Sequence, residues 1–258
     1  LLNTMTTQLE NDPISWGSQT NLIQFEPIAI GGTAQQLAGS IEKRIEQARL
    51  ISARTGAPIK YLTKAEASAF SAMLRSDATV AGLDAQGQPQ DATRVNKMMM
   101  LATLVSNFGT RAPDVLKQLA GVDKEMAHVG GLLLLDAPEN ANLAMAGFEM
   151  IKAGNEAIGS KGLEAKENFA DLVGPALIFQ PNARGSGLEV AHAIYTKKAI
   201  DAGEKQFNKD LWNESVQLAF GYNAATGKGG FAAVRDKTTL LPSSMDADQF
   251  ETILENLT

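Results

Sequence analysis

Apolar residues recur every three or four positions over much of the chain, a spacing that places them on one face of an α-helix. The pattern is clearest after residue 33, where Thr33 and Gln36 have the spacing of a capping box. Gly56 and Pro58 then mark the end of the helix, since glycine and proline commonly follow the last helical turn. These signals predict a helix up to about residue 55 that buries Leu37, Ile41, Ile45, Ala48 and Ile51.

The same spacing predicts several further helices. Thr63 and Glu66 form a second capping-box pair, ahead of a helix that buries Ala67, Phe70 and Leu74. Pro113 suits the first turn of a short helix that contains Leu116 and Leu119. A helix over 91–108 is predicted to bury Val95, Met98, Met99, Ala102 and Val105, with the methionine run as core filler. A helix over 139–152 is predicted to bury Leu143, Ala146, Phe148 and Met150 or Ile151.

Helices are also predicted at 163–173, at 187–202 and from Asn208 to Phe220. Residues 123–135 fit either a helix or a strand, because Gly130–Gly131 weakens a helix and a leucine run follows it. Glycines predict a loop or hinge at 156–162, and Pro181 lies in a predicted loop at 180–185.

The two ends of the chain differ from this helical middle. Residues 1–32 are predicted to be irregular or partly extended, with turn signals at 11–13 and at 31–32 and a short strand at 22–25. Near the other end, the β-prone stretches 231–235 and 238–241 predict a hairpin that turns at Asp236–Lys237. Asp246 then opens a last helix that carries Phe250, Ile253, Leu254 and Leu257.

The predicted fold is therefore mainly α: a multi-helix bundle with a small C-terminal unit of a β-hairpin plus a helix. We expect an irregular N-terminal segment over 1–32 and a helical domain over 33–205. A helix–hairpin–helix unit over 206–258 is expected to pack on that domain. Because the sequence begins with Leu1 and not with Met, we expect it to be part of a longer protein.

Composition agrees with a globular helical protein. Hydrophobic residues make up 44% and charged residues 20% of the 258 positions, which is ordinary for a packed domain. Aromatic residues are only 6%, while alanine is abundant and methionine occurs nine times, a mixture that suits closely packed helices. The absence of cysteine excludes disulfides and thiolate zinc sites. The apolar run 130–135 is far too short to predict a transmembrane helix.

Charge argues against nucleic acid as the main partner. Residues 1–129 are neutral overall, so the net charge of −6 lies entirely in residues 130–258. The longest basic run is Lys197–Lys198, whereas a nucleic-acid binder normally presents a basic face.

The stretch GYNAATGKGG at 221–230 contains the Gly-Lys pair of a phosphate-binding loop. Such a loop needs four residues between its glycines and a hydroxyl residue after the lysine. Here five residues separate Gly221 from Gly227, and Gly229 follows Lys228. We therefore predict a structural loop between a helix and the hairpin, with no nucleotide bound.

Trp212–Ser215 and Tyr222–Ala224 resemble two motifs of lytic transglycosylases: a Glu-Ser pair that holds the catalytic acid, and an Ala-Tyr-Asn motif that lines the cleft. In that family many tens of residues separate the motifs, whereas seven residues separate Ser215 from Asn223 here. We interpret Glu214 as a solvated helix residue.

The histidines do not predict a metal site. His128 follows Asp123 and Glu125, and His192 lies three positions after Glu189, but two potential ligands do not make a site. We therefore predict no catalytic, cofactor-binding or metal-binding residues, and no cofactor.

One resemblance covers about the last third of the chain. It starts with the helix Val190–Tyr195 and the acidic, tryptophan-bearing helix Asp210–Val216. It continues with the Gly229–Gly230 hairpin and with Leu240–Met245 ahead of the last helix. This pattern resembles the C-terminal region of large phage-encoded virion proteins of the internal or ejection type. Those proteins often carry a lytic transglycosylase domain far upstream, and their hairpin usually turns at Asn-Gly, where this chain has Asp236–Lys237.

The resemblance implies a non-enzymatic, structural or interacting role in a phage or prophage virion-associated protein. The expected partners are other virion proteins or a second copy of the chain. The expected location is the virion, or the cytoplasm of the bacterial host before assembly. Two alternatives stay open: a peptidoglycan-lytic enzyme with Glu214 as its acid, and an adaptor that uses its acidic half to bind a basic partner.

Overall fold

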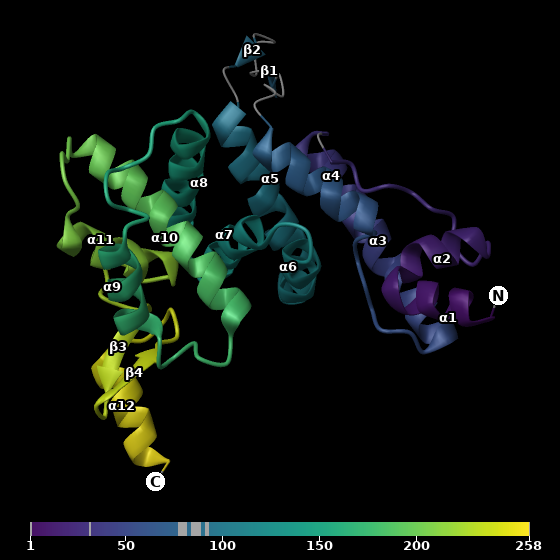
Figure 1. Cartoon of the computed structure of the whole chain (residues 1–258). Coiled ribbons are helices and arrows are strands. Elements are labelled where there is room, and N and C mark those ends of the chain that lie inside the picture. Colours follow the sequence, from purple (N-terminus) through teal and green to yellow (C-terminus); the bar gives the residue numbers. More distant parts are fainter. Residues whose placement is uncertain (1, 31, 77–81, 84–88, 91–92, 258) are drawn as a thin grey trace. The chain divides into compact units, whose positions relative to one another are not determined.

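The computed structural model describes residues 2–30, 32–76, 82–83, 89–90 and 93–257. The fold is mainly helical, with a small antiparallel hairpin and a helix near the C-terminus, as predicted (Figure 1). Its contacts divide the chain into two compact units, Leu1–Gly130 and Gly131–Thr258. The division falls inside α7 (Lys124–Leu134), whereas the sequence predicted a boundary at residues 205–206.

Helices also make up most of the first unit. They are α1 (Leu2–Asn11), α2 (Pro13–Gln19), α3 (Ala34–Thr55), α4 (Lys64–Arg75), α5 (Thr93–Phe108), a short 3₁₀ turn (Gly109–Arg111), α6 (Ala112–Ala120) and the start of α7. The strands β1 (Gly82–Leu83) and β2 (Pro89–Gln90) pair antiparallel, with Gly82 opposite Gln90.

The predicted start signals of α3 and α4 and the predicted end of α3 are confirmed. Both capping boxes form, with Thr33 and Gln36 at α3 and Thr63 and Glu66 at α4. Gly56 ends α3 in the left-handed conformation at φ 71°. The predicted inward residues of both helices are buried except Ile45, which is half-buried. Local sequence therefore specifies where both helices start, where α3 stops and which residues of both face the core.

The prediction that residues 1–32 are irregular is wrong for α1 and α2. The Asn11-Asp12-Pro13 stretch is a helix start. The Asp12 carboxylate accepts a hydrogen bond from the Ser15 backbone N–H at 3.1 Å, and Pro13 occupies the first turn of α2. Asparagine and aspartate favour both turns and helix N-termini because their side-chain oxygens accept hydrogen bonds from free backbone N–H groups. Proline suits both places because its φ is fixed and its missing N–H is not needed there. The stretch Asn11-Asp12-Pro13 is therefore typical of a turn and of a helix start alike, and the sequence alone did not distinguish the two.

No strand forms at 22–25 either. The chain there runs without regular structure alongside α3, which supplies the hydrogen bonds that a sheet would have supplied. Gln47 Nε2 donates to the Gln24 carbonyl at 2.7 Å, and Arg44 Nη2 donates to the Glu26 carbonyl at 2.7 Å. Backbone carbonyls are strong acceptors, and side chains can pair with them as well as a neighbouring strand can.

α5 forms as predicted, but it faces the core differently. Met98 and Val105 are buried, whereas Met99 is 49% exposed and Ala102 is exposed. The side chain of Val95 lies outside those that the structure describes. Apolar residues surround most of this helix, so periodicity alone did not identify the buried stripe. That stripe also contains Met100, Leu101, Leu104 and Phe108.

The second unit is built around one long helix. Its elements are α8 (Pro138–Lys152), α9 (Leu163–Val173), α10 (Pro181–Asp201), α11 (Lys209–Ala219), β3 (Phe231–Val234), β4 (Lys237–Leu240) and α12 (Ala247–Asn256). α10 packs extensively against both α8 and α11 (Figure 1). Tyr195 and Trp212, from α10 and α11, are fully buried with ring centroids 5.5 Å apart. The predicted irregular stretch at 156–162 also lies in this unit and forms no regular helix or strand.

Two further predictions for this unit are wrong. Residues 180–185 are not a loop, because Pro181 occupies the first turn of α10. The buried face of α8 is also different: of the predicted residues only Ala146 is buried, while Leu143, Phe148, Met150 and Ile151 are half-buried. The buried residues of α8 are mostly small instead, among them Ala141, Ala144, Ala146 and Gly147, and Gly147 lies against Ala193 of α10.

The C-terminal hairpin has a two-residue turn. Val234 pairs with Lys237, and Arg235 and Asp236 both have positive φ, 47° and 61°. This is the geometry of a type I′ turn, which matches the twist of the strands. The turn therefore lies one residue earlier than the predicted Asp236–Lys237.

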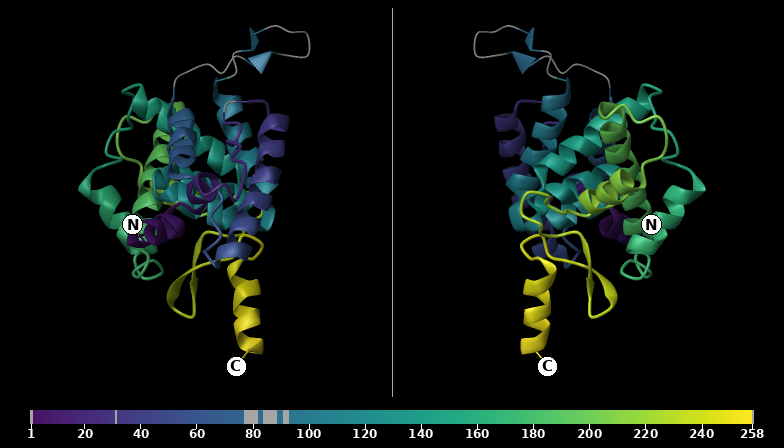
Figure 2. Two further views of the ribbon diagram at one scale, coloured as in Figure 1. Left: turned by 90° about the vertical axis from the view of Figure 1, so that its right-hand side faces the viewer. Right: turned by 90° about the vertical axis from the view of Figure 1, so that its left-hand side faces the viewer.

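Asp246 caps α12 through a capping box with Gln249, and α12 contacts β3. None of the α12 residues is buried, and the helix extends away from α8, α10 and α11 in both views of Figure 2. No helix in the part of the chain that the structure describes is both long and apolar enough to cross a lipid bilayer.

Candidate functional site

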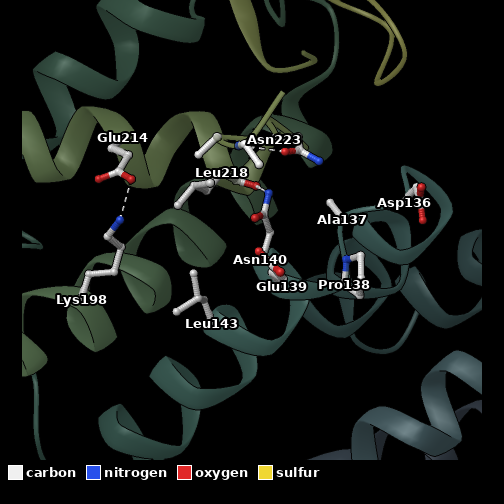
Figure 3. Close-up of a pocket in the computed structure, with 12 residues that line it drawn as sticks. Asp136, Ala137, Pro138, Glu139, Asn140, Leu143, Lys198, Glu214, Leu218 and Asn223 are labelled. Carbon is white, nitrogen blue, oxygen red and sulfur yellow. Dashed lines mark hydrogen bonds and ion pairs between the residues drawn. The ribbon is translucent and has the colours of Figure 1, made fainter. Parts of the chain in front are cut away.

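The second unit contains an open cleft of about 380 Å³ (Figure 3). Its walls come from the start of α8, from α10, from α11 and from the loop that follows α11. The lining residues are Asp136, Ala137, Pro138, Glu139, Asn140, Leu143, Lys198, Glu214, Leu218, Asn223, Ala224 and Ala225. Three carboxylates and one ammonium group are among them, so the lining carries a formal net charge of −2.

Asn140 ties α8 to the loop after α11. Its side-chain Nδ2 donates to the carbonyls of Leu218 and Tyr222, both at 2.9 Å. Asn140 is only 5% exposed although it lies close to the exposed start of α8. A buried amide that joins segments 78 and 82 positions away fixes one wall of the cleft relative to the other.

The glycine loop is built by positive backbone angles. Gly221, Gly227, Gly229 and Gly230 have φ values of 82°, 70°, 73° and 69°, which residues with side chains rarely adopt. The loop follows α11 and leads into β3, the context that was predicted. Its end is held by Gln217, whose amide donates to the Phe231 carbonyl at 2.9 Å and accepts from the Phe231 N–H at 2.6 Å.

Glu214 lies at the edge of the cleft, paired with a lysine. Its carboxylate is 2.6 Å from Lys198 Nζ, and its side chain is 42% exposed. A glycosidase acid must direct its carboxyl group at the leaving oxygen, whereas the Glu214 carboxyl group is paired with the lysine. This geometry suits a structural ion pair better than an acid catalyst.

Glu214 and Asn223 line the same cleft, although their spacing in the sequence does not match that of the transglycosylase motifs. Asn223 is occupied locally, because its Oδ1 accepts from the backbone N–H groups of Ala225 and Thr226. Ser215 is buried, and its hydroxyl donates to the Leu211 carbonyl at 2.7 Å. Asn223 therefore stabilises the loop, and Ser215 stabilises the helix. The cleft residues that were not predicted from the sequence are Asn140, Lys198, Asp136 and Glu139.

His192 lies buried in α10. Its Nε2 is 2.7 Å from Glu156 Oε1 without making a well-oriented hydrogen bond, and Glu156 also pairs with Lys161 at 2.8 Å. Asp123 and Glu125, near His128 in sequence, both pair with Arg75 at 2.8 and 3.1 Å. Among the residues that the structure describes, no group of three or more His, Asp or Glu side chains could hold a metal ion.

We predict a pH dependence of stability from His192. Its pKa is lowered mainly by burial, although the carboxylates of Glu156 and Glu189 oppose this and Lys161 adds to it. The unfolded chain therefore binds a proton at higher pH than the folded chain, so the free energy of unfolding falls as pH drops below about 6.5. Thermal unfolding between about pH 7.5 and 5 should show this fall, and His192→Gln should flatten it. A slope that survives in His192→Gln and disappears in His128→Gln would contradict the assignment.

Comparison with protein-family models, with curated proteins and with solved structures finds no match for this chain. Its function is therefore inferred from its residues and their arrangement.

Proposed function

We propose that this chain is a non-enzymatic structural or interaction component of a phage or prophage virion-associated protein. In this role it binds other virion proteins or a second copy of itself. The resemblance of residues 190–250 to internal virion proteins supports the virion setting, and the Glu214–Lys198 ion pair supports the absence of catalysis at the cleft.

One observation carries the interaction role. α12 leaves the body of the second unit and keeps an apolar stripe with little cover: Leu257 is 78% exposed and Ile253 is 40% exposed. Phe250 is half-buried on the same side of the helix. Exposed apolar area is unfavourable in water, and a contiguous exposed stripe commonly marks a binding surface.

Detection of this chain in purified phage particles tests the virion setting. The source bacterium is induced, particles are banded by density, and peptides from residues 1–258 are sought by mass spectrometry. We expect the peptides to co-purify with intact particles. Peptides confined to the soluble lysate would contradict the proposal and favour the adaptor.

A peptidoglycan-lytic function is the second candidate, favoured only by the position of Glu214 and Asn223 on one cleft. We expect the purified chain to release no soluble fragments from bacterial cell walls, and Glu214→Gln to leave that result unchanged. Clearing by the unmutated chain that is lost in Glu214→Gln, but kept in the exposed-acid control Glu164→Gln, would establish the lytic function instead.

A further inference from the structure

The cleft of the second unit contains hydrogen-bond acceptors that have no donor. The side chains of Asp136 and Glu139 are exposed at its rim and make no hydrogen bond or ion pair with any residue that the structure describes. Asn140 adds a third acceptor from inside the wall, and Glu214 presents its second carboxylate oxygen beside its ion pair with Lys198.

Chemistry fixes the orientation of the Asn140 amide. The two groups that face its Nδ2 are carbonyl oxygens, of Leu218 and Tyr222, so a flipped amide would set oxygen against oxygen. Oδ1 must therefore point away from these two carbonyl oxygens, and Figure 3 shows the Asn140 side chain among the residues that line the cleft. Oδ1 has no hydrogen-bond donor among the described residues, and Asn140 as a whole is only 5% exposed.

An alternative reading of Asp136 and Glu139 is that they only offset the positive end of α8. Glu139 lies in the first turn of α8, and Asp136 precedes it. However, the dipole of a helix places only about +0.5 charge at its N-terminus. Two carboxylates exceed this, and Lys198 is already matched by Glu214. The cleft therefore stays negative, which disfavours an anionic ligand and favours a cation.

We propose that this cleft is a binding site for an alkylammonium group, of the kind that a lysine side chain or a free primary amine carries. Such a group has three N–H donors and one positive charge. Asn140 Oδ1, in the wall of the cleft, accepts a hydrogen bond from one N–H of the ammonium group. Asp136 and Glu139, at the rim, supply the negative charge that balances it. The apolar side chains of Leu143 and Leu218 contact the alkyl stem. The inference rests on the cleft alone and holds whether or not the chain works in a virion.

Titration of the ¹⁵N-labelled full chain with n-butylammonium chloride tests the site, with butan-1-ol as the neutral control of equal length. We expect saturable changes in the side-chain amide signals of Asn140 and in the backbone signals of Glu139, and none with butan-1-ol. Nα-acetyl-lysine N-methylamide forms the second arm. Tighter binding of this compound than of butylammonium assigns the source as a protein lysine, and equal binding assigns it as any primary amine.

Isosteric variants identify the carboxylates. The pair Asp136→Asn and Glu139→Gln removes two charges at exposed positions and is expected to weaken butylammonium binding by about fivefold or more, since exposed charge pairs contribute modestly but measurably to binding. The matched control pair Glu164→Gln and Asp171→Asn removes two exposed charges from α9, outside the cleft, and should leave binding unchanged. The proposal is overturned if butan-1-ol gives the same changes, if neither ammonium compound gives a saturable change, or if the control pair weakens binding as much.

Discussion

Replacing Gly147 with alanine is expected to destabilise the second unit by about 3 kcal/mol or more, because the new methyl group has no room. Gly147 lies where α8 packs against α10, and a Cβ built there would be 1.7 Å from the Ala193 carbonyl oxygen and 2.3 Å from its carbonyl carbon. These are backbone atoms of a buried helix, so no side chain can rotate away. The two helices must separate, and the small-residue contact between them is lost.

The measurement can be confined to the second unit. The chain has two tryptophans, Trp16 in α2 and the fully buried Trp212 in α11. In a Trp16→Phe background, the urea dependence of Trp212 fluorescence reports the second unit, and we expect Gly147→Ala to lower its midpoint strongly.

Gly39 provides the matched control for the same substitution. It lies inside α3, and a Cβ built there meets no atom within 4 Å. Gly39→Ala, followed by circular dichroism, should stabilise the chain by about 0.5–1 kcal/mol, because alanine costs less backbone entropy than glycine in a helix. A Gly147→Ala midpoint that equals or exceeds that of the parent would show that α8 and α10 are not packed as described.

Gly147 also shows why the sequence predicted helices better than their packing. Capping boxes and glycine C-caps are local, so the starts of α3 and α4 and the end of α3 follow from a few neighbouring residues. The buried face of α8 depends on a partner helix 46 positions away at Ala193, and small residues were not counted as an inward face. Periodicity scores side-chain hydrophobicity, whereas close helix packing selects for small size.

The same limit applies to the cleft. Glu214 and Asn223 were found in the sequence because they resemble a known motif, and the structure does bring both to one cleft. Asn140 and Lys198 carried no signal, because each looks like an ordinary polar residue of an amphipathic helix. Their roles arise from contacts with Leu218, Tyr222 and Glu214, which only the tertiary structure brings together.

The largest effect expected in the first unit comes from Arg44, a fully buried arginine in α3. Its Nη1 and Nη2 donate to the Glu66 carboxylate at 2.5 and 2.8 Å, and they also donate to the carbonyls of Tyr61 and Glu26. Glu66 in turn accepts from the backbone N–H groups of Ile28, at 2.9 Å, and Thr63, at 3.0 Å. This one pair therefore connects α3, the start of α4 and the irregular segment before α3.

The electrostatics of this pair show that both charges are needed. Burial alone would raise the pKa of Glu66, but the hydrogen bonds and charge of Arg44, with the backbone donors, hold it below its ordinary value of 4.5. Glu66 is therefore ionised when the chain is folded, and its contribution to stability is lost as pH falls below 4.5. Without Arg44, burial would disfavour the charged Glu66 carboxylate with no cation to oppose it.

We expect Arg44→Met to cost about 3–5 kcal/mol, the usual cost of removing one partner from a buried ion pair. Methionine keeps an apolar stem in the same space, so the loss comes from the uncompensated carboxylate and from the two carbonyls that lose their donors. Lys43→Met, one position away, is the control, because Lys43 pairs with Glu26 at the surface with 62% of its side chain exposed. Exposed pairs contribute about 1 kcal/mol at most. Urea unfolding followed by circular dichroism should separate the two variants, and equal midpoints would mean that the Arg44–Glu66 pair does not hold these segments together.

A second experiment uses the double variant Arg44→Met with Glu66→Leu, which removes both charges. We expect it to recover part of the lost stability, since the cost lies in the unpaired charge and not in the absence of the pair.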